Sequence, residues 1–171
     1  VRKKVINNYG FDKVYKQGFN IKTPIDLDLQ NIATKALRKG LESYDKRRGW
    51  RGPILNKKIN NEWKKGLEKF ILEKSIGWEL AIVKRIDKFE AVVETTNGSI
   101  GIIKHEDINW TRKNFNQIFK TGDLIYVKKK NEGHYSLKQV PLANGGIVVM
   151  DPFSGRVLAM SGGFSFKKSE F

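Results

Sequence analysis

The chain has 171 residues, of which 33 are lysine or arginine and 18 are aspartate or glutamate, so that its formal net charge is +15. This length suits one ordinary domain or two small ones, and 39% hydrophobic residues support a packed core. The absence of cysteine excludes disulfides, cysteine metal sites and cysteine nucleophiles, and only two histidines argue against metal chemistry. The positive charge indicates attraction to polyanions such as nucleic acid or anionic lipid.

The first fifty residues contain the clearest helix signal of the chain. Asp26 is a suitable N-cap, and apolar residues recur every three or four positions through residues 27–48, which predicts a long amphipathic helix ended by Gly49. Its apolar face consists of Leu29, Ile32, Ala33, Ala36, Leu37, Leu41 and Tyr44. Before this helix we predict a short helix ending at Gly10 and a strand over residues 19–23, where the residues alternate until Pro24.

Residues 51–141 change from a helical to an alternating pattern. A second helix is predicted from Asn60 or Asn61 to Gly77, with an apolar side formed by Trp63, Leu67, Phe70 and Ile71. Strands follow at residues 79–86, 89–96, 99–104, 124–130 and 134–140, with a short helix at 115–119 in the long link. Five short strands with a helical link after the third are typical of an OB-type barrel.

The barrel also resembles an S1-type RNA-binding domain, because Phe89 opens the second strand and His105 follows the third. Single-strand binding requires several exposed aromatic rings on neighbouring strands, on which bases stack. Here Glu90 and Val92 stand where that family has glycine and an aromatic residue, and Glu94 adds negative charge. An S1-like RNA-binding module is therefore the alternative hypothesis, and we expect no specific nucleic-acid partner.

Residues 145–163 predict a β-hairpin. Two apolar runs, 147–150 and 157–160, flank a turn that contains Pro152 and Gly155. Because both runs are apolar on both faces, the hairpin should be covered on both sides in a larger sheet. Without that cover its backbone donors and apolar side chains form a template for pairing, and we expect self-association through residues 145–163.

Four segments, in order, resemble the bifunctional class A penicillin-binding proteins of the subgroup that carries an OB-like insert in the transpeptidase domain. They are 14–30 (VYKQGFNIKTPIDLDLQ), 44–53 (YDKRRGWRGP), the hairpin 145–163, and 162–171 (GGFSFKKSEF). The resemblance implies an α+β, mainly β fold. Residues 51–141 would form a five-stranded OB-like barrel, inserted between an N-terminal part of the transpeptidase domain (1–50) and its β-hairpin (142–171).

What this resemblance implies for function is a bacterial cell-wall synthase. The intact protein would be anchored in the inner membrane and face the periplasm, polymerise lipid II, and cross-link stem peptides by D,D-transpeptidation through an acyl-serine enzyme. Its partners would be peptidoglycan and, at the OB-like insert, an outer-membrane activator or another cell-wall protein. Direct contact of the basic face with anionic glycan or lipid is a second interpretation of the insert. No cofactor is implied.

The chain contains the pattern Ser-x-x-Lys twice, with its serine at Ser43 and at Ser165, and chance alone produces such matches in a lysine-rich chain. The functional motif needs its serine at the start of a helix, so that the lysine lies beside it one turn later. Ser43 instead lies near the C-terminal end of the predicted long helix. Ser165 precedes the position, beyond Phe171, where the resemblance places the true motif. We therefore predict no catalytic, cofactor-binding or metal-binding residue in this chain.

The remaining conspicuous side chains are assigned structural roles. We expect core positions for Trp63, Phe70 and Trp78, and a boundary position for Trp110. The lysines at 128–130 should form a solvated strand edge, where they also discourage sheet pairing. Three arginines should fix the junction after the long helix by capping its carbonyl groups: Arg47, Arg48 and Arg51.

Overall fold

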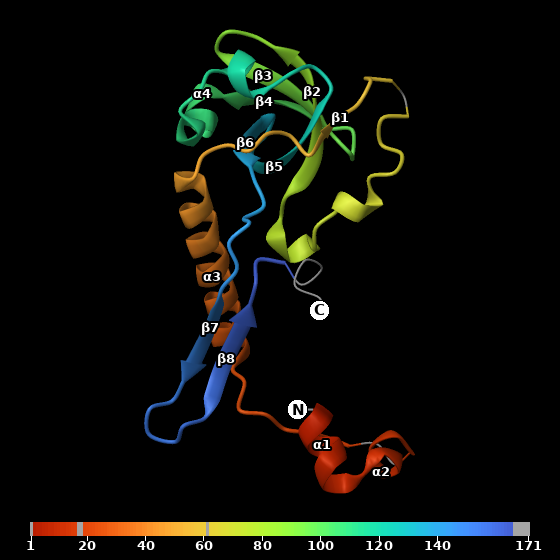
Figure 1. Cartoon of the computed structure of the whole chain (residues 1–171), viewed down its shortest axis with the longest axis vertical. Helices are drawn as coiled ribbons and strands as arrows, with labels where there is room; N and C mark the ends of the chain where they lie inside the picture. Colours follow the sequence, from red (N-terminus) through yellow and green to blue (C-terminus); the bar gives the residue numbers. More distant parts are fainter. Residues whose placement is uncertain (1, 17–18, 61, 166–171) are drawn as a thin grey trace.

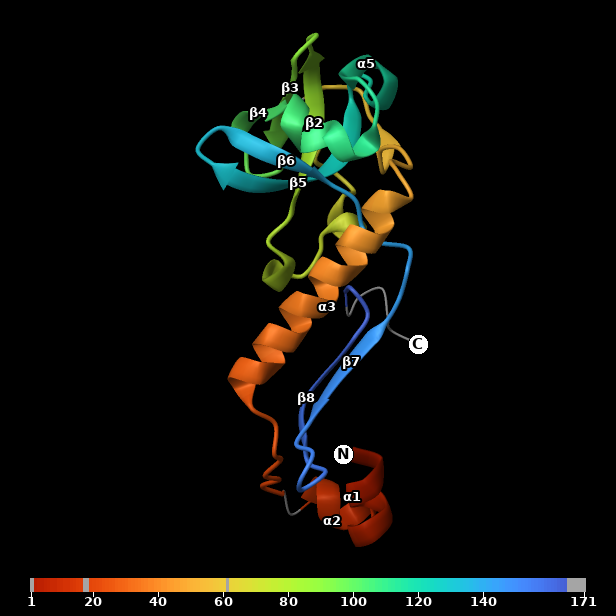
Figure 2. The same ribbon diagram turned by 90° about the vertical axis from the view of Figure 1, so that its left-hand side faces the viewer.

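The structure is a computed structural model that describes residues 2–16, 19–60 and 62–165. The molecule is elongated, with a β-barrel at one end and two short helices at the other (Figure 1). Between them, helix α3 (Leu27–Arg47) runs beside the hairpin of β7 (Gly146–Met150) and β8 (Val157–Gly162), as a view turned by 90° also shows (Figure 2).

The N-terminal region contains α1 (Arg2–Tyr9) and α2 (Phe11–Lys16), neither of which has a buried residue. The predicted helix end at Gly10 is confirmed, because this glycine has a φ of 81° between the two helices. The predicted strand over residues 19–23 is wrong. These residues have no regular structure, because no strand among the described residues lies beside them to complete the backbone hydrogen bonds.

The bounds of helix α3 agree with its prediction to within one residue, but Ile32, Ala36 and Tyr44 of the predicted apolar face are exposed. The Asp26 carboxylate accepts hydrogen bonds of 2.9 Å from the backbone N–H groups of Asp28 and Leu29, which satisfies two of the unpaired donors at the helix N-terminus. At the other end the Arg48 N–H donates to the Asp45 carbonyl, and Gly49 follows with a φ of 85°. The helix therefore starts and stops where the capping residues predicted.

The hairpin packs one face on α3 and leaves the other face exposed. β7 and β8 are antiparallel, with Val148 opposite Met160, and both of these side chains are more than half exposed. The opposite face, which includes the fully buried Ala159, lies towards α3. Gln30 of α3 fastens the contact: its side-chain amide donates to the Met160 carbonyl (2.9 Å) and accepts from the Met160 N–H (3.1 Å). Among the described residues, nothing covers the second apolar face that the sequence predicts to be buried.

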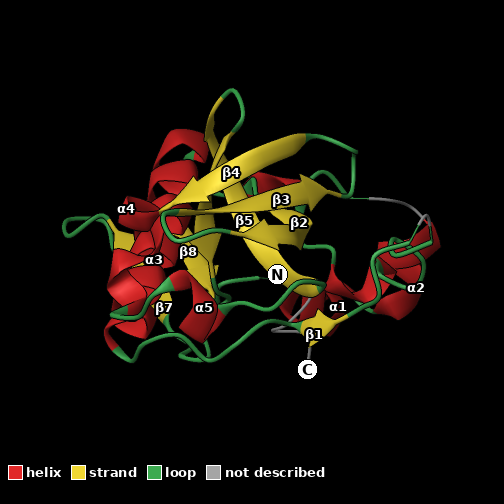
Figure 3. Ribbon diagram, turned by 90° about the horizontal axis from the view of Figure 1, so that it is seen from above, coloured by secondary structure: helices red, strands yellow, loops and turns green. Residues whose placement is uncertain are grey.

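The predicted five-stranded barrel is confirmed. Its strands are β2 (Glu79–Ile86), β3 (Glu90–Thr95), β4 (Ile100–Lys104), β5 (Asp123–Asn131) and β6 (His134–Lys138). The order is β5-β2-β3-β4-β6, and β6 also pairs with β5, so the sheet closes on itself. The β4–β6 pair is parallel and the other pairs are antiparallel. From above, α4 (His105–Ile108) and α5 (Phe115–Ile118) lie at one side of the barrel strands (Figure 3).

Two features of the barrel surroundings were not predicted. A two-residue strand, β1 (Leu55–Asn56), pairs with β5, and it is too short to produce an alternating pattern. In the link between β4 and β5, α5 corresponds to the predicted helix, whereas α4 and the 3₁₀ turn η3 (Asn109–Thr111) were not expected. All three helical pieces close one end of the barrel, where Ile108 and Phe115 are buried in its core.

The predicted second helix over residues 60–77 is wrong. The described residues of this segment, 60 and 62–77, contain only two 3₁₀ turns, η1 (Glu68–Phe70) and η2 (Lys74–Ile76). Asn61, one of the two predicted N-caps, lies outside the described residues. The Lys57 ammonium binds the carbonyl groups of Trp63 and Lys65, which a helix would use internally, and Gly66 adopts a φ of 75°. Most apolar residues of the segment nevertheless reach the core, because Trp63, Leu67, Leu72 and Ile76 are buried. Ile71, which the predicted apolar side included, is 49% exposed.

The core has two parts. One fills the barrel interior, and the other joins the outer surface of the barrel to Leu41 of α3 and Phe164 after β8. The segments before and after the barrel are therefore neighbours in space, since α3 packs on both β7 and β8. Helix α3 and the β7–β8 hairpin thus pack on each other although the barrel separates them in the sequence.

Candidate functional site at the junction of helix, barrel and hairpin

The chain leaves α3 for the barrel at residues 48–54 and returns from the barrel to β7 at residues 139–145. Both crossings meet at Asp45, which is 2% exposed although it carries a carboxylate. Its Oδ1 accepts from Arg51 Nη1 (2.7 Å) and from the Leu142 N–H (3.1 Å), while Oδ2 accepts from Gln139 Nε2 (2.8 Å). The buried Asp45 side chain thus binds both the segment that enters the barrel and the segment that leaves it.

Arg51 and Gln139 complete this network. The second guanidinium nitrogen of Arg51 donates to the Val140 carbonyl (2.7 Å), and the Arg51 N–H donates to Gln139 Oε1 (2.9 Å). The Gln139 amide also donates to the Gly49 carbonyl at the end of α3. A buried carboxylate is favourable only when its lone pairs are used, and here three donors satisfy it.

The prediction that arginines fix the junction is correct for Arg51, but the predicted contact of its side chain with the helix carbonyls is wrong. Arg51 fixes the junction, but it binds the Asp45 carboxylate and the Val140 carbonyl rather than the last carbonyls of α3. Arg48 caps the helix through its backbone N–H, and the Arg47 guanidinium lies 5.4 Å above the Tyr44 ring. The sequence contained no signal for Asp45, because a carboxylate inside a charged helical run is normally solvated.

Charge and aromatic contacts surround the junction. Glu42 of α3 pairs with Lys138 of β6 at 2.7 Å. The Lys46 ammonium lies 5.5 Å from the centre of the Trp110 ring, and burial, followed by the charge of Lys138, lowers the pKa of Lys46 below its usual value. Trp110 also packs edge-on against Trp50, which places it at the boundary between α3 and the barrel, as predicted.

A second contact joins the barrel surroundings to the residues that follow β8. The Arg38 side chain of α3 donates through Nε to the Phe164 carbonyl (3.0 Å) and through Nη1 to the carbonyl and hydroxyl of Ser75 (3.2 and 3.1 Å). The Ser165 hydroxyl hydrogen-bonds to the Glu73 carboxylate. Ser165, one of the two Ser-x-x-Lys serines, is thus held by a carboxylate beside η2, whereas Ser43 is exposed on α3.

The junction is bordered by two grooves on either side of residues 50–53. One, of about 540 Å³, is lined by apolar residues that include Ile54, Leu72 and the exposed Leu142. Its lining also includes Arg51 and Lys138, which pair with Asp45 and Glu42, and Lys69. The other, of about 750 Å³, lies towards α5 and is lined mainly by polar residues. Trp50, Gly52 and Pro53 contribute to both grooves.

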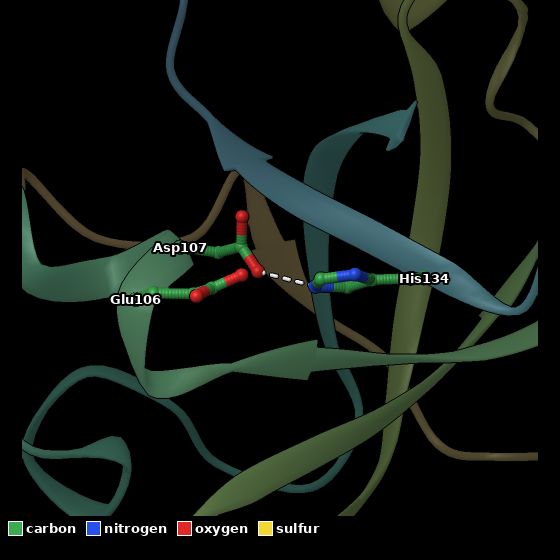
Figure 4. Close-up of side chains that lie close together, drawn as sticks. All are labelled: Glu106, Asp107 and His134. Atoms are coloured by element: carbon green, nitrogen blue, oxygen red, sulfur yellow. Dashed lines mark hydrogen bonds and ion pairs between the residues drawn. The ribbon is translucent and has the colours of Figure 1, made fainter. Parts of the chain in front are cut away.

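A separate polar cluster lies on the barrel, where Glu106 and Asp107 of α4 meet His134 of β6 (Figure 4). One ligand atom from each residue lies within 4.8 Å of the others, which is the spacing of a metal site. However, the Lys130 ammonium lies 3.1 Å from Glu106 and 3.0 Å from Asp107, and both hydrogen bonds raise the pKa of Lys130. His134 Nε2 lies 2.6 Å from the other oxygen of Asp107. The cluster therefore already contains a cation, supplied by the chain.

The face that resembles an S1 domain carries the exposed rings of Phe89 and His105, which line the same pocket. Phe89 is 71% exposed, with the Lys88 ammonium 5.3 Å from its ring centre. Glu94 lies on β3 and pairs with Lys84 at 3.0 Å; this hydrogen bond lowers the pKa of Glu94. Phe89 precedes β3 and His105 begins α4, so these two rings do not form a row of aromatic side chains on neighbouring strands, which base stacking requires.

The predicted structural roles of the other side chains agree with the structure. Trp63 and Trp78 are buried, and Phe70 packs against the same core cluster while part of its ring remains accessible. The lysines at 128–130 are exposed on β5, as predicted, and Lys130 forms the ion pairs described above.

Several solved and curated proteins that resemble this chain carry the name penicillin-binding protein 1A. The crystal structure of penicillin-binding protein 1A from Haemophilus influenzae matches 99% of this chain with a TM-score of 0.80 and 27% identity, and the match covers 26% of that chain. Penicillin-binding protein 1A of Rickettsia felis is 36% identical over 94% of this chain, which covers 20% of the relative. The protein of the same name from Pseudomonas aeruginosa is 30% identical over 99% of this chain, which covers 22% of the relative.

The family model described as penicillin-binding protein OB-like domain matches residues 50–143, more than half of the chain. The chain belongs to the penicillin-binding proteins of the 1A type. This confirms the resemblance drawn from the four sequence segments and the OB-like fold predicted for the barrel. In this penicillin-binding protein the RNA-binding alternative is not favoured, since the barrel is the OB-like domain of the family. The chain spans about a fifth of the length of the curated relatives that it matches.

Proposed function

We propose that this chain is the non-catalytic, OB-like interaction region of a bifunctional peptidoglycan synthase, together with the transpeptidase scaffold that flanks it. The observation that carries the proposal is that α3 packs directly on β7 and β8, although the barrel lies between them in the sequence. It supports domain limits at 1–50 and 142–171 for the two parts of the scaffold and at 51–141 for the insert. The relatives named penicillin-binding protein 1A support the assignment to such a synthase.

The intact synthase would polymerise lipid II with one domain and cross-link stem peptides with another. Cross-linking would proceed by attack of an activated serine on a D-Ala-D-Ala amide, release of D-Ala, and transfer of the acyl group to an amine on a neighbouring strand. We place it in the bacterial inner membrane, facing the periplasm. Among the described residues no helix has the length and apolar character that a membrane span requires.

In this proposal the chain itself has no catalytic, cofactor-binding or metal-binding residue. Ser43 is exposed near the C-terminal end of α3, so it does not begin a helix. The Ser165 hydroxyl is hydrogen-bonded to Glu73, and Lys168 of its Ser-x-x-Lys pattern lies outside the described residues. Labelling with a fluorescent penicillin tests the proposal: the full-length protein should be labelled, and the 171-residue chain should remain unlabelled. Labelling of the short chain that disappears in Ser43→Ala or Ser165→Ala would contradict it.

We further propose that the insert is the docking surface for an outer-membrane activator or another cell-wall protein. The groove of about 540 Å³ beside Arg51 supports this, because its apolar lining, which includes the exposed Leu142, suits an apolar anchor of a partner. Titration of the full-length protein with candidate activators should show binding that Leu142→Glu weakens, while Phe89→Glu on the far side of the barrel has no effect. No binding by any candidate would contradict this assignment.

Contact of the basic face with anionic glycan or lipid is the competing interpretation of the insert. Such an attraction must weaken as salt screens the charges, whereas an apolar anchor is much less sensitive to salt. Binding of anionic vesicles or glycan strands that fails to decrease with salt would exclude this second interpretation.

A further inference from the structure

The residues that follow β8 leave the hairpin and enter the surface beside the barrel. Gly163 makes the turn with a φ of 69°, and its N–H donates to the Gly145 carbonyl at the start of β7. Phe164 and Ser165 are then 5% and 1% exposed. The Phe164 ring lies 5.0 Å from the ring of Trp78, which precedes β2 of the barrel. The path of these two residues is therefore determined by the insert as well as by the hairpin.

Two polar side chains, Arg38 and Glu73, fix the positions of Phe164 and Ser165. Arg38 is on α3, yet its guanidinium binds the Phe164 carbonyl on one side and the Ser75 carbonyl and hydroxyl on the other. Glu73, in the insert just before η2, receives the Ser165 hydroxyl at 2.8 and 3.0 Å from its two oxygens. The planar fork of an arginine fixes the direction of its partners as well as their distance. Three separate parts of the chain thus meet at Phe164 and Ser165.

We propose that Arg38 and Glu73 are positioning residues of the transpeptidase: through them the OB-like insert sets the path of the chain that leaves β8. This inference rests on the proposed function, which places the serine nucleophile beyond Phe171. A displacement of the chain ahead of a nucleophile slows acyl transfer, because reactivity depends steeply on the alignment of the attacking atom. The insert is then a structural support of the acylation step as well as a docking surface.

The test uses the full-length protein and two activities in the same sample. Acylation by a fluorescent penicillin reports the transpeptidase, and polymerisation of lipid II reports the other domain. We expect Arg38→Ala and Glu73→Ala to lower the acylation rate about tenfold, with polymerisation unchanged. Glu73→Gln, which can still bind the Ser165 hydroxyl, should restore most of the rate. The matched control is Arg47→Ala, an arginine on the same helix that contacts the Tyr44 ring.

The outcomes distinguish failure of the positioning role of Arg38 and Glu73 from failure of the proposed function. Acylation at the wild-type rate in both alanine variants would overturn the inference, and so would a parallel loss of both activities with a lower melting temperature, which indicates a role in folding alone. Failure of Glu73→Gln to recover the rate would overturn the role of the Ser165 hydrogen bond. If the unaltered full-length protein is not labelled by penicillin, the proposed function itself fails.

Discussion

Arg51 Nη1 lies 2.7 Å from Asp45 Oδ1, so the first residues of the insert are tied to the helix that precedes it. The Asp45 side chain is 2% exposed and that of Arg51 is 31% exposed. Loss of the ion pair should therefore cost more free energy at the buried carboxylate than at the guanidinium. Because Asp45 also receives the Leu142 N–H and the Gln139 amide, a single residue holds both crossings between scaffold and barrel.

We expect Asp45→Ala to lower the free energy of unfolding by about 3 kcal/mol, since it leaves three donors at the junction without their acceptor. Urea unfolding followed by tryptophan fluorescence measures this change. Ser43→Ala, two residues away on the exposed face of α3, should change it by less than about 0.5 kcal/mol. Equal effects of the two substitutions would show that Asp45 has no special role.

Ionisation of Tyr126 should lower the free energy of unfolding at alkaline pH. Its hydroxyl donates to the Phe70 carbonyl (2.7 Å), and burial raises its pKa from 10.0 to about 12. Because the folded state holds the phenol proton more tightly than the unfolded state, this contribution is complete below about pH 10 and is lost between about pH 10 and 12.

We therefore expect the wild-type chain to lose stability more steeply than Tyr126→Phe between about pH 10 and 12, as measured by urea unfolding at each pH. At neutral pH the variant should be less stable by about 1 kcal/mol, because the Phe70 carbonyl loses its donor. Tyr9→Phe, at an exposed position, is the control. Identical slopes for the wild type and Tyr126→Phe would refute the assignment.

Gly101 should be irreplaceable at the seam between β4 and β6. A Cβ at this position would lie 2.6 Å from the Tyr135 ring and 2.7 Å from the Gly133 carbonyl oxygen. Since the Tyr135 ring is buried and cannot move away, we expect Gly101→Ala to destabilise the barrel by about 1–3 kcal/mol in thermal unfolding.

The matched control for Gly101 is Gly146→Ala in β7, where the nearest atom to the added Cβ is 3.6 Å away. This substitution should change the melting temperature little. A tolerated Gly101→Ala would mean that the β4–β6 seam opens more easily than the parallel pairing of these strands suggests.

The exposed face of the hairpin should make the 171-residue chain self-associate. Val148, Met150 and Met160 are 57%, 54% and 61% exposed on this face, and such an apolar strand surface favours pairing with a second copy. Sedimentation should therefore show a dimer or larger species. The double variant Val148→Lys with Met160→Glu keeps an attractive cross-strand pair and should be monomeric. Phe89→Lys on the barrel should leave the association unchanged. A monomeric wild-type chain would contradict the prediction.

The cluster of Glu106, Asp107 and His134 should bind Zn²⁺ only after its internal cation is removed. In the wild-type chain the Lys130 ammonium binds both carboxylates, so Zn²⁺ should not raise the melting temperature. Lys130→Ala should become stabilised by Zn²⁺, and adding His134→Asn should abolish that stabilisation. An equal zinc response in the wild type and in Lys130→Ala would show that Lys130 does not compete for the site.

The sequence alone predicted α3, the five barrel strands and the hairpin, because each depends on a local period, a cap or a turn residue. The signals at Asp26 and Gly49 lie at the ends of the segment that they terminate. The alternation in β3 and β4 follows from one face being buried, whereas β2 and β5 are buried on both faces over residues 80–83 and 123–127. It did not predict the path of residues 60–77, where the Lys57 ammonium, outside the segment, takes the carbonyl groups of Trp63 and Lys65.

Only the tertiary structure revealed the sites. Asp45 and Leu142 are 97 residues apart, Arg38 and Phe164 are 126 residues apart, and Asp107 and His134 are 27 residues apart. No periodic pattern encodes such pairings, because they arise when elements that are far apart in the sequence pack against one another. The sequence thus determined which elements form, and the burial of a few polar side chains between those elements decided how scaffold and insert are joined.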